Sequence, residues 1–272
     1  SPYGKFLEMI KLNMFKKHPY KGTTIGKMEH LDAATLEEFQ AFNAKFYVPN
    51  NAVLVVAGDI NVAEVKVMIE NYFGPIPRGE DIVRNFPKEE PITETIKATA
   101  YDKNIQIPAI LATYRTPGFG TRDAYVLDMI SSYLSGGKSS VLYKKLVDEK
   151  KMALQVQAVN LGQMDYSVFA FFALPLGETE LSQLISEIEE EVVKIQKNLI
   201  SEKNYKKLQN KFENRFVNSN SSIQGIAQSL ADYYTLYGDT NLINSTIDIY
   251  RSITREEIKD AANKYLNTKK SK

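Results

Sequence analysis

One helix-start pattern occurs twice in this chain, and the repeat limits the possible folds more than any other feature. Residues 35–38 and residues 254–257 both begin with Thr and end with Glu, which is the form of a capping box. In such a box each side chain accepts the other residue's backbone N–H, and a helix begins there. At the same offset four further pairs correspond in character: Met28 with Ile247, Leu31 with Tyr250, Lys45 with Lys264, and Phe46 with Tyr265. The pattern leaves two interpretations open, a duplicated domain or two unrelated helix starts.

A charged, proline-containing stretch lies between the two capping boxes. Residues 78–91 follow the helix-breaking residues 74–77, and we predict that they form an inter-domain linker. Residues 1–77 then form one part of the chain, and residues 92–272 form the other. If both parts are copies of one domain, the first is the C-terminal part of that domain and the second is nearly complete.

Apolar spacing predicts three helices and one strand before the linker. Helices are expected within residues 1–17, from the first capping box to Pro49, and over residues 62–73. Residues 52–57 are a continuous apolar run, which is typical of a strand covered on both faces.

After the linker, the same patterns predict strands over residues 92–100, 109–115, 154–161 and 166–174. Helices are expected over residues 122–134, 140–148, 179–199, 202–217, 223–237 and 241–250, and again from Thr254. The alternating Phe and Tyr residues within 165–172 are expected to lie in the core. The predicted fold class is α+β, with a mainly antiparallel sheet and helices packed on one face.

The charge balance and the scarcity of some residue types exclude several functions. Lys and Arg total 34 against 33 Asp and Glu, and this balance offers no electrostatic footprint for nucleic acid. The chain has no Cys, which excludes disulfides, thiolate zinc sites and Cys nucleophiles. It also has no run of about 18 apolar residues that would form a membrane-spanning helix.

Two short runs resemble functional motifs, but their context favours a structural role. Gly137-Lys138-Ser139 resembles the end of a phosphate-binding loop. That loop would need Gly where Ser132 stands, and it should follow a strand rather than a helix. A helix that stops and restarts explains the run better. The acidic run 187–191 is typical of a solvated helix face rather than of a metal site.

Five motifs resemble those of the M16 peptidase family, the group of pitrilysin, insulysin and mitochondrial processing peptidase. They are residues 18–20 (HPY), 46–59 (FYVPNNAVLVVAGD), 72–77 (YFGPIP), 136–143 (GGKSSVLY) and 146–150 (LVDEK). The motifs span nearly the whole chain in the family's order. The resemblance implies a processing-peptidase-like metallohydrolase fold in duplicated form.

The resemblance also implies that this chain carries no catalytic residue and no metal ligand. The family holds one zinc ion with an inverted H-x-x-E-H motif and a downstream Glu, and these residues are expected upstream of Ser1. Within the chain, an H-x-x-E-H motif ending at His30 would need His at Gly26. His18, the other histidine, is expected to be a loop residue whose ring bonds the backbone. Zinc is therefore expected in the full-length parent and no cofactor in this fragment.

A second functional element of the family is an Arg and a Tyr seven residues apart, which bind and polarise the substrate carbonyl. The motif around Leu146 places Val147 at the Arg position and Leu154 at the Tyr position. Neither side chain can donate a hydrogen bond. The substrate-binding residues of this chain therefore stay unknown. The parent either takes the Arg and Tyr from another half or is not catalytic.

The function implied by the resemblance is a non-catalytic portion of an M16-type zinc metalloendopeptidase, which forms part of a chamber that encloses peptides or unfolded segments. The alternative is a catalytically inactive M16 homologue that acts as a scaffold or as a peptide-binding partner subunit. Outside the family, a plain interaction module remains open. The expected partner is a homologous M16 subunit or second half, and the expected location is the bacterial periplasm or cell envelope.

Overall fold

Three antiparallel strands form the sheet of the computed structural model, which describes residues 3–267. Strands β1 (Ile110–Pro117) and β2 (Ala153–Leu161) both pair with the central strand β3 (Tyr166–Pro175), in the order β1-β3-β2. The β2–β3 register shifts between Ala153 and Gln155. The sheet belongs to one of two compact units, here called the sheet unit, which comprises residues 3–22, 88–213 and 247–267 among those described.

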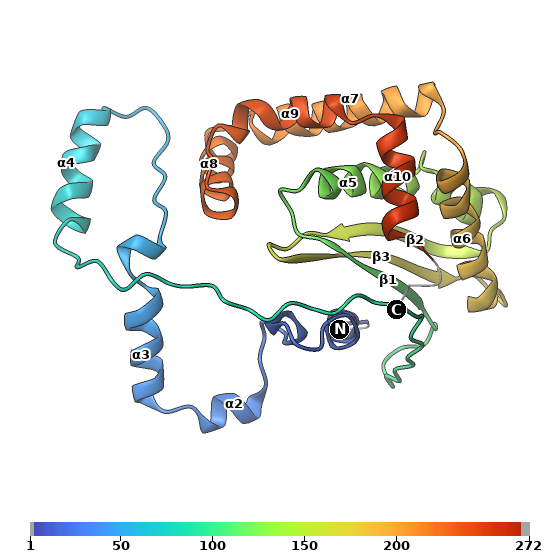
Figure 1. The fold of residues 1–272 in the computed structure, drawn as a ribbon, viewed down its shortest axis with the longest axis horizontal. Coiled ribbons are helices and arrows are strands. Elements are labelled where there is room, and N and C mark those ends of the chain that lie inside the picture. The colour runs from blue at the N-terminus through green and yellow to red at the C-terminus, as the bar shows by residue number, and fades with distance from the viewer. Residues whose placement is uncertain (1–2, 268–272) are drawn as a thin grey trace. The chain divides into compact units, whose positions relative to one another are not determined.

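Helices α5 (Arg122–Ser135), α6 (Leu181–Lys197) and α10 (Arg255–Tyr265) pack on one face of this sheet (Figure 1). Phe169 and Phe171 of β3 are fully buried in that core. Alternate residues of β3 point to the other face. There Val168 packs against α1 (Phe6–Met14) and the residue that follows it, Phe15. The predicted strand at 166–174, its core aromatics and the α+β class are confirmed.

Four further elements belong to the sheet unit, wholly or in part. They are the 3-10 turn η1 (Pro19–Lys21), the π-helix η3 (Tyr143–Glu149) and most of α7 (Glu202–Ser219) and α9 (Leu242–Ser252). Residues 140–148 were expected to form an ordinary α-helix. Most of that segment is wound more widely, as the bond from the Lys150 N–H to the Lys145 carbonyl shows (2.9 Å).

Both predicted capping boxes are formed. The Thr35 and Glu38 backbone N–H groups each bond the other residue's side chain (2.9 and 3.3 Å) at the start of α3 (Leu36–Phe46). The second box has the same pair of bonds, from the Thr254 N–H to Glu257 (2.7 Å) and from the Glu257 N–H to Thr254 (3.1 Å). The same local sequence therefore starts both helices in the same way.

The second unit, here called the helical unit, comprises Thr23–Pro87 and Asn214–Thr246. Its elements are α2 (Met28–Ala33), α3, the 3-10 turn η2 (Pro49–Asn51), α4 (Val62–Phe73) and α8 (Ile223–Tyr237). None of the described hydrophobic residues of this unit is buried. The helical spacing of Phe39 and Phe42 predicts that both side chains face inward from α3, but each is 58% exposed.

Two predicted strands are wrong. Residues 52–57 and 92–100 form no strand, and no described segment pairs with either. A strand needs a hydrogen-bonded neighbour, which an apolar run cannot supply by itself. Val53, Leu54 and Val56 are accordingly 39–54% exposed rather than covered on both faces.

The boundaries of the predicted domains differ from the boundaries of the compact units. The chain passes from the helical unit to the sheet unit at Pro87 and Lys88, within the predicted linker 78–91. Residues 3–22 belong to the same unit as the sheet, and residues 214–246 belong to the helical unit. A domain duplication is a statement about common ancestry, and the contacts within the structure do not test it. The division into residues 1–77 and 92–272 therefore stays a prediction.

Candidate functional site

The two positions aligned with the Arg and Tyr of the resemblance lie on neighbouring elements of the sheet unit. Val147 lies on the π-helix η3, where it is half-buried and packs against the core. Leu154 follows on β2 and is 48% exposed. Both side chains are hydrocarbon, so neither position can polarise a substrate carbonyl.

Polar groups next to Val147 are used to attach η3 to α6. The Lys145 ammonium lies 2.7–2.9 Å from carboxylate oxygens of Glu187, Glu190 and Glu191. Burial alone would lower the pKa of Lys145, but its bonds to the three carboxylates raise it above the ordinary value. The acidic run 187–191 is therefore not simply a solvated face, because the Glu191 side chain is buried. With their charges paired, these groups anchor the helix and are not a candidate metal site.

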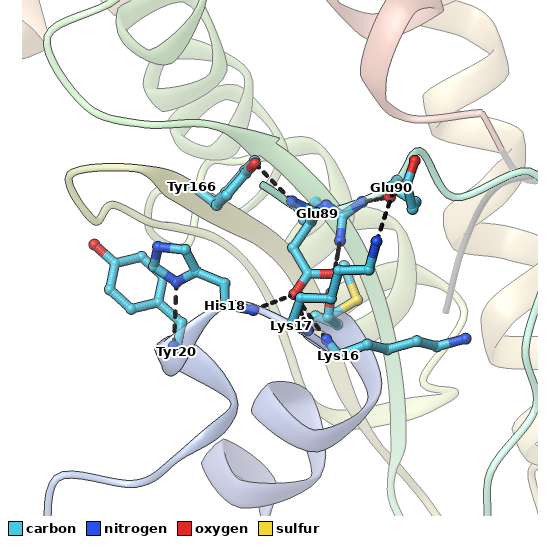
Figure 2. A network of polar contacts seen from close by, with 9 residues as sticks. Lys16, Lys17, His18, Tyr20, Glu89, Glu90 and Tyr166 are labelled. Atoms are coloured by element: carbon cyan, nitrogen blue, oxygen red, sulfur yellow. Dashed lines mark hydrogen bonds and ion pairs between the residues drawn. The ribbon is translucent and has the colours of Figure 1, made fainter. Parts of the chain in front are cut away.

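A buried carboxylate, that of Glu89, lies at the centre of a polar network that includes residues near the start of the chain (Figure 2). The Glu89 side chain is only 3% exposed, and its Oε1 accepts the backbone N–H groups of Lys16, Lys17 and His18 at 2.7–2.8 Å. Its Oε2 lies 3.3 Å from Arg115 Nη1. We call these five residues the Glu89 clasp. The clasp joins the residues after α1 to the last part of the predicted linker, residues 78–91, and to Arg115 on β1.

The surroundings of the clasp fix its two charged groups. The Arg115 guanidinium also bonds the Met14 carbonyl (2.9 Å) and lies over the Tyr166 ring. Burial would raise the pKa of Glu89, but the three backbone N–H groups and Arg115 outweigh burial and hold the pKa below its ordinary value. Both carboxylate oxygens are occupied by donors. Glu89 is therefore a structural anion rather than a general base.

His18 has the role expected for a loop residue. Its Nδ1 accepts the Tyr20 backbone N–H (3.2 Å), and its Nε2 lies 3.4 Å from Asp165 Oδ2. In the neutral ring the proton must then be on Nε2, which faces the carboxylate. The ring packs edge-on against Tyr20 and Tyr166. Both ring nitrogens thus face groups of the sheet unit itself.

The described residues do not fit a zinc site. Among them no group of three or more His, Asp or Glu side chains is arranged so that it could hold a metal ion. His18 Nδ1 is taken by a backbone N–H, and His30 lies exposed on α2. We therefore derive no chemical step through a metal held by this chain.

Reasoning from the sequence missed the Glu89 clasp. Glu89 and Glu90 look alike in a charged, proline-rich stretch, yet the Glu90 side chain is 77% exposed and only Glu89 is buried. The three backbone donors to Glu89 lie more than 70 residues earlier in the chain, and Arg115 lies 26 residues later. No local pattern carries that information.

Comparison with known proteins places these features in a family context. Residues 33–212 match the family model described as "Peptidase M16 inactive domain". A zinc protease of Helicobacter pylori, PqqE, is 28% identical over the whole of this chain. The chain spans 61% of that relative's length.

Solved structures agree on the fold. A protease from Helicobacter pylori superimposes with a TM-score of 0.89 at 26% identity, over all of this chain and 66% of that one. The periplasmic protease PqqL from Escherichia coli superimposes with a TM-score of 0.74 at 15% identity, over 96% of this chain and 29% of that one. At that identity the second likeness concerns the fold alone.

Proposed function

Because this chain belongs to the peptidase M16 family and matches its inactive domain, we propose that it is the non-catalytic portion of a zinc metalloendopeptidase. In this proposal the chain forms part of the wall of a chamber that encloses peptides or unfolded segments. The observation that carries the proposal is the match to the inactive domain over residues 33–212. The hydrocarbon side chains of Val147 and Leu154 support it, since they supply surface but no carbonyl-polarising group.

Zinc and its ligands belong, in this proposal, to other parts of the parent protein. The Helicobacter relative is named a zinc protease, and this chain corresponds to 61% of its length. The described residues of this chain offer no such ligand set. The partner would be a homologous M16 subunit or a second half, which would also supply an Arg and a Tyr.

The same two positions favour a second candidate. A parent that also lacks the zinc ligands would be a catalytically inactive homologue, which would act as a scaffold or as a peptide-binding subunit. Val147 and Leu154 would then be two of several lost functional positions.

For the location we propose the bacterial periplasm or cell envelope. The support is the name of the Escherichia coli structure, which is described as a periplasmic protease. Among the described residues, no helix is long and apolar enough to cross a membrane.

Zinc content and peptide hydrolysis test the proposal directly. We expect the purified chain to retain no stoichiometric zinc after dialysis and to leave a fluorogenic peptide library uncleaved. The complete native protein should retain one zinc per chain and cleave the library, alone or with its partner. A complete protein that retains no zinc would favour the second candidate, the catalytically inactive homologue. Stoichiometric zinc in this chain alone, lost in His18→Ala, would overturn both.

A further inference from the structure

A small pocket opens where the end of α5 meets α7 in the sheet unit. Its volume is about 150 Å³, and its lining includes Ser132, Ser140, Lys144, Lys207 and Lys211. The turn between α5 and the following helical segment borders it, and Gly137 of that turn has a φ of +106°. This is the run that resembles the end of a phosphate-binding loop. It follows a helix, as the sequence suggests, and has Ser132 where that loop would need Gly.

The pocket is positively charged. Three of its lining residues are Lys, and the lining residues that the structure describes include no Asp or Glu. Lys207 Nζ bonds the Ser139 hydroxyl (2.6 Å) and the Ser139 carbonyl (3.2 Å), and Lys211 Nζ bonds the Gly136 carbonyl (2.6 Å). Because the acceptors of Lys207 are neutral, they hold its ammonium group in place without cancelling its charge.

Two serine hydroxyls in the lining have unused hydrogen-bonding capacity. Ser140 is only 5% exposed, and its Oγ has no hydrogen-bond partner among the described residues. The Oγ of Ser132 is buried and unpartnered in the same way. A buried hydroxyl without a partner costs about 1–3 kcal/mol, so such groups are rare and call for an explanation. Both serines line the pocket, so an oxygen of a bound ligand is the candidate acceptor for their hydroxyls.

We propose that this pocket binds a phosphate-sized oxyanion, held by the ammonium groups of Lys144, Lys207 and Lys211 and by the hydroxyls of Ser132 and Ser140. Ammonium groups and hydroxyl donors together suit a compact anion with several acceptor oxygens. They disfavour a cation or an apolar ligand. Pockets for drug-sized ligands have about 300–1,000 Å³. The smaller pocket here fits one phosphate group, either free or as the end of a small phosphomonoester. The inference does not depend on the proposed function.

Calorimetric titration of the full chain with inorganic phosphate tests the site, at constant ionic strength and with chloride as the competing anion. We expect saturable binding by the wild-type chain and at least tenfold weaker binding by Lys207→Ala. The matched control is Lys203→Ala, because Lys203 is exposed on the same helix but lies outside the pocket. Its affinity should stay within twofold of the wild type.

The variant Ser140→Ala separates a binding role from a structural one. Its hydroxyl has no partner in the protein, so its removal should leave the unfolding midpoint unchanged or raise it, while phosphate binding weakens several-fold. A parallel titration with glycerol 3-phosphate identifies the form in which the phosphate group binds. Tighter binding of glycerol 3-phosphate indicates a phosphomonoester as the ligand, and tighter binding of inorganic phosphate indicates the free ion. The proposal is overturned if the wild type shows no saturable binding or chloride competes equally. It is also overturned if Lys203→Ala weakens binding as much as Lys207→Ala, or if Ser140→Ala binds normally.

Discussion

At the scale of single residues, the Glu89 carboxylate accepts hydrogen bonds from three successive backbone N–H groups. Those groups belong to Lys16, Lys17 and His18, and the same carboxylate faces the Arg115 guanidinium. Hydrogen bonds to charged groups each contribute about 1.5–3 kcal/mol, more than those between neutral groups. A single substitution in the clasp should therefore weaken the attachment between segments of the sheet unit that are distant in the sequence.

We expect Glu89→Gln to destabilise the sheet unit by about 1.5–3 kcal/mol, because the amide keeps an acceptor but leaves Arg115 without its counter-charge. Urea unfolding followed by circular dichroism measures the loss. The matched control is Glu90→Gln. Its side chain is 77% exposed and forms a surface ion pair with the exposed Lys17, so its effect should stay within about 0.5 kcal/mol. Equal effects of the two substitutions would contradict the burial-based argument.

The Glu89→Gln variant also gives a pH test. The pKa of Glu89 is lowered in the folded state, so its contribution to stability is fully present above the unfolded-state pKa, about 4.5. This contribution is lost as the pH falls below that value, through the lowered pKa. The stability difference between wild type and Glu89→Gln should therefore be constant near neutral pH and shrink in acid. A difference that grows in acid would contradict the lowered pKa.

At the scale of elements, the two capping boxes put the same local motif into two different surroundings. Helices α3 and α10 have 11 residues each and begin with the same Thr and Glu pair. Ile258 and Ala262 of α10 are buried against the core, whereas α3 buries no residue. The Glu257 carboxylate also binds Arg122 of α5 at 2.8 and 3.0 Å. Only the second box is therefore coupled to tertiary packing.

We expect Thr254→Ala to lower the stability of the sheet unit by about 1 kcal/mol, the usual effect of losing an N-cap. Thr35→Ala should fray α3 locally and change the main unfolding transition by less than about 0.5 kcal/mol. Urea midpoints of the two variants measure the contrast. A similar loss in both would mean that α3 takes part in the cooperative core.

Elements with local signals could be predicted from the sequence, and those that depend on distant partners could not. Both boxes and the helices after them follow from spacing within a few residues, as does β3 with its buried Phe169 and Phe171. Residues 52–57 have the apolar, β-branched composition of a buried strand, but a strand forms only where a neighbouring strand supplies hydrogen bonds. At the candidate site, the hydrocarbon character of Val147 and Leu154 was readable. The role of Glu89 was not, because its backbone donors lie more than 70 residues earlier in the chain and Arg115 lies 26 residues later.

At the scale of the whole molecule, burial is divided unevenly between the two units. All the buried hydrophobic residues that the structure describes belong to the sheet unit. Isolated helices shorter than about 12–15 residues are marginal in water, so α3 and α4 have little to hold them in the helical unit. Stability should therefore differ between the units.

Hydrogen exchange of the backbone amides tests this difference. We expect the amides of α3 to exchange at least about 100-fold faster than those of α10, because local openings range from nearly no free energy up to the global value. The comparison is matched in helix length and in capping box. Equal protection of the two helices would show that the helical unit is stabilised to the same degree as the sheet unit.

The packing of α1 on β3 also has a consequence for biosynthesis. Ile10 and Met14 of α1 share a small core with Val168 of β3, so the packing of this helix is completed by a strand that is made much later. At about 5–20 residues per second, a ribosome needs about 8–30 s to translate the intervening stretch. During that interval the apolar face of α1 has no strand to cover it. The nascent chain should therefore be a client for a ribosome-associated chaperone until β3 emerges from the exit tunnel.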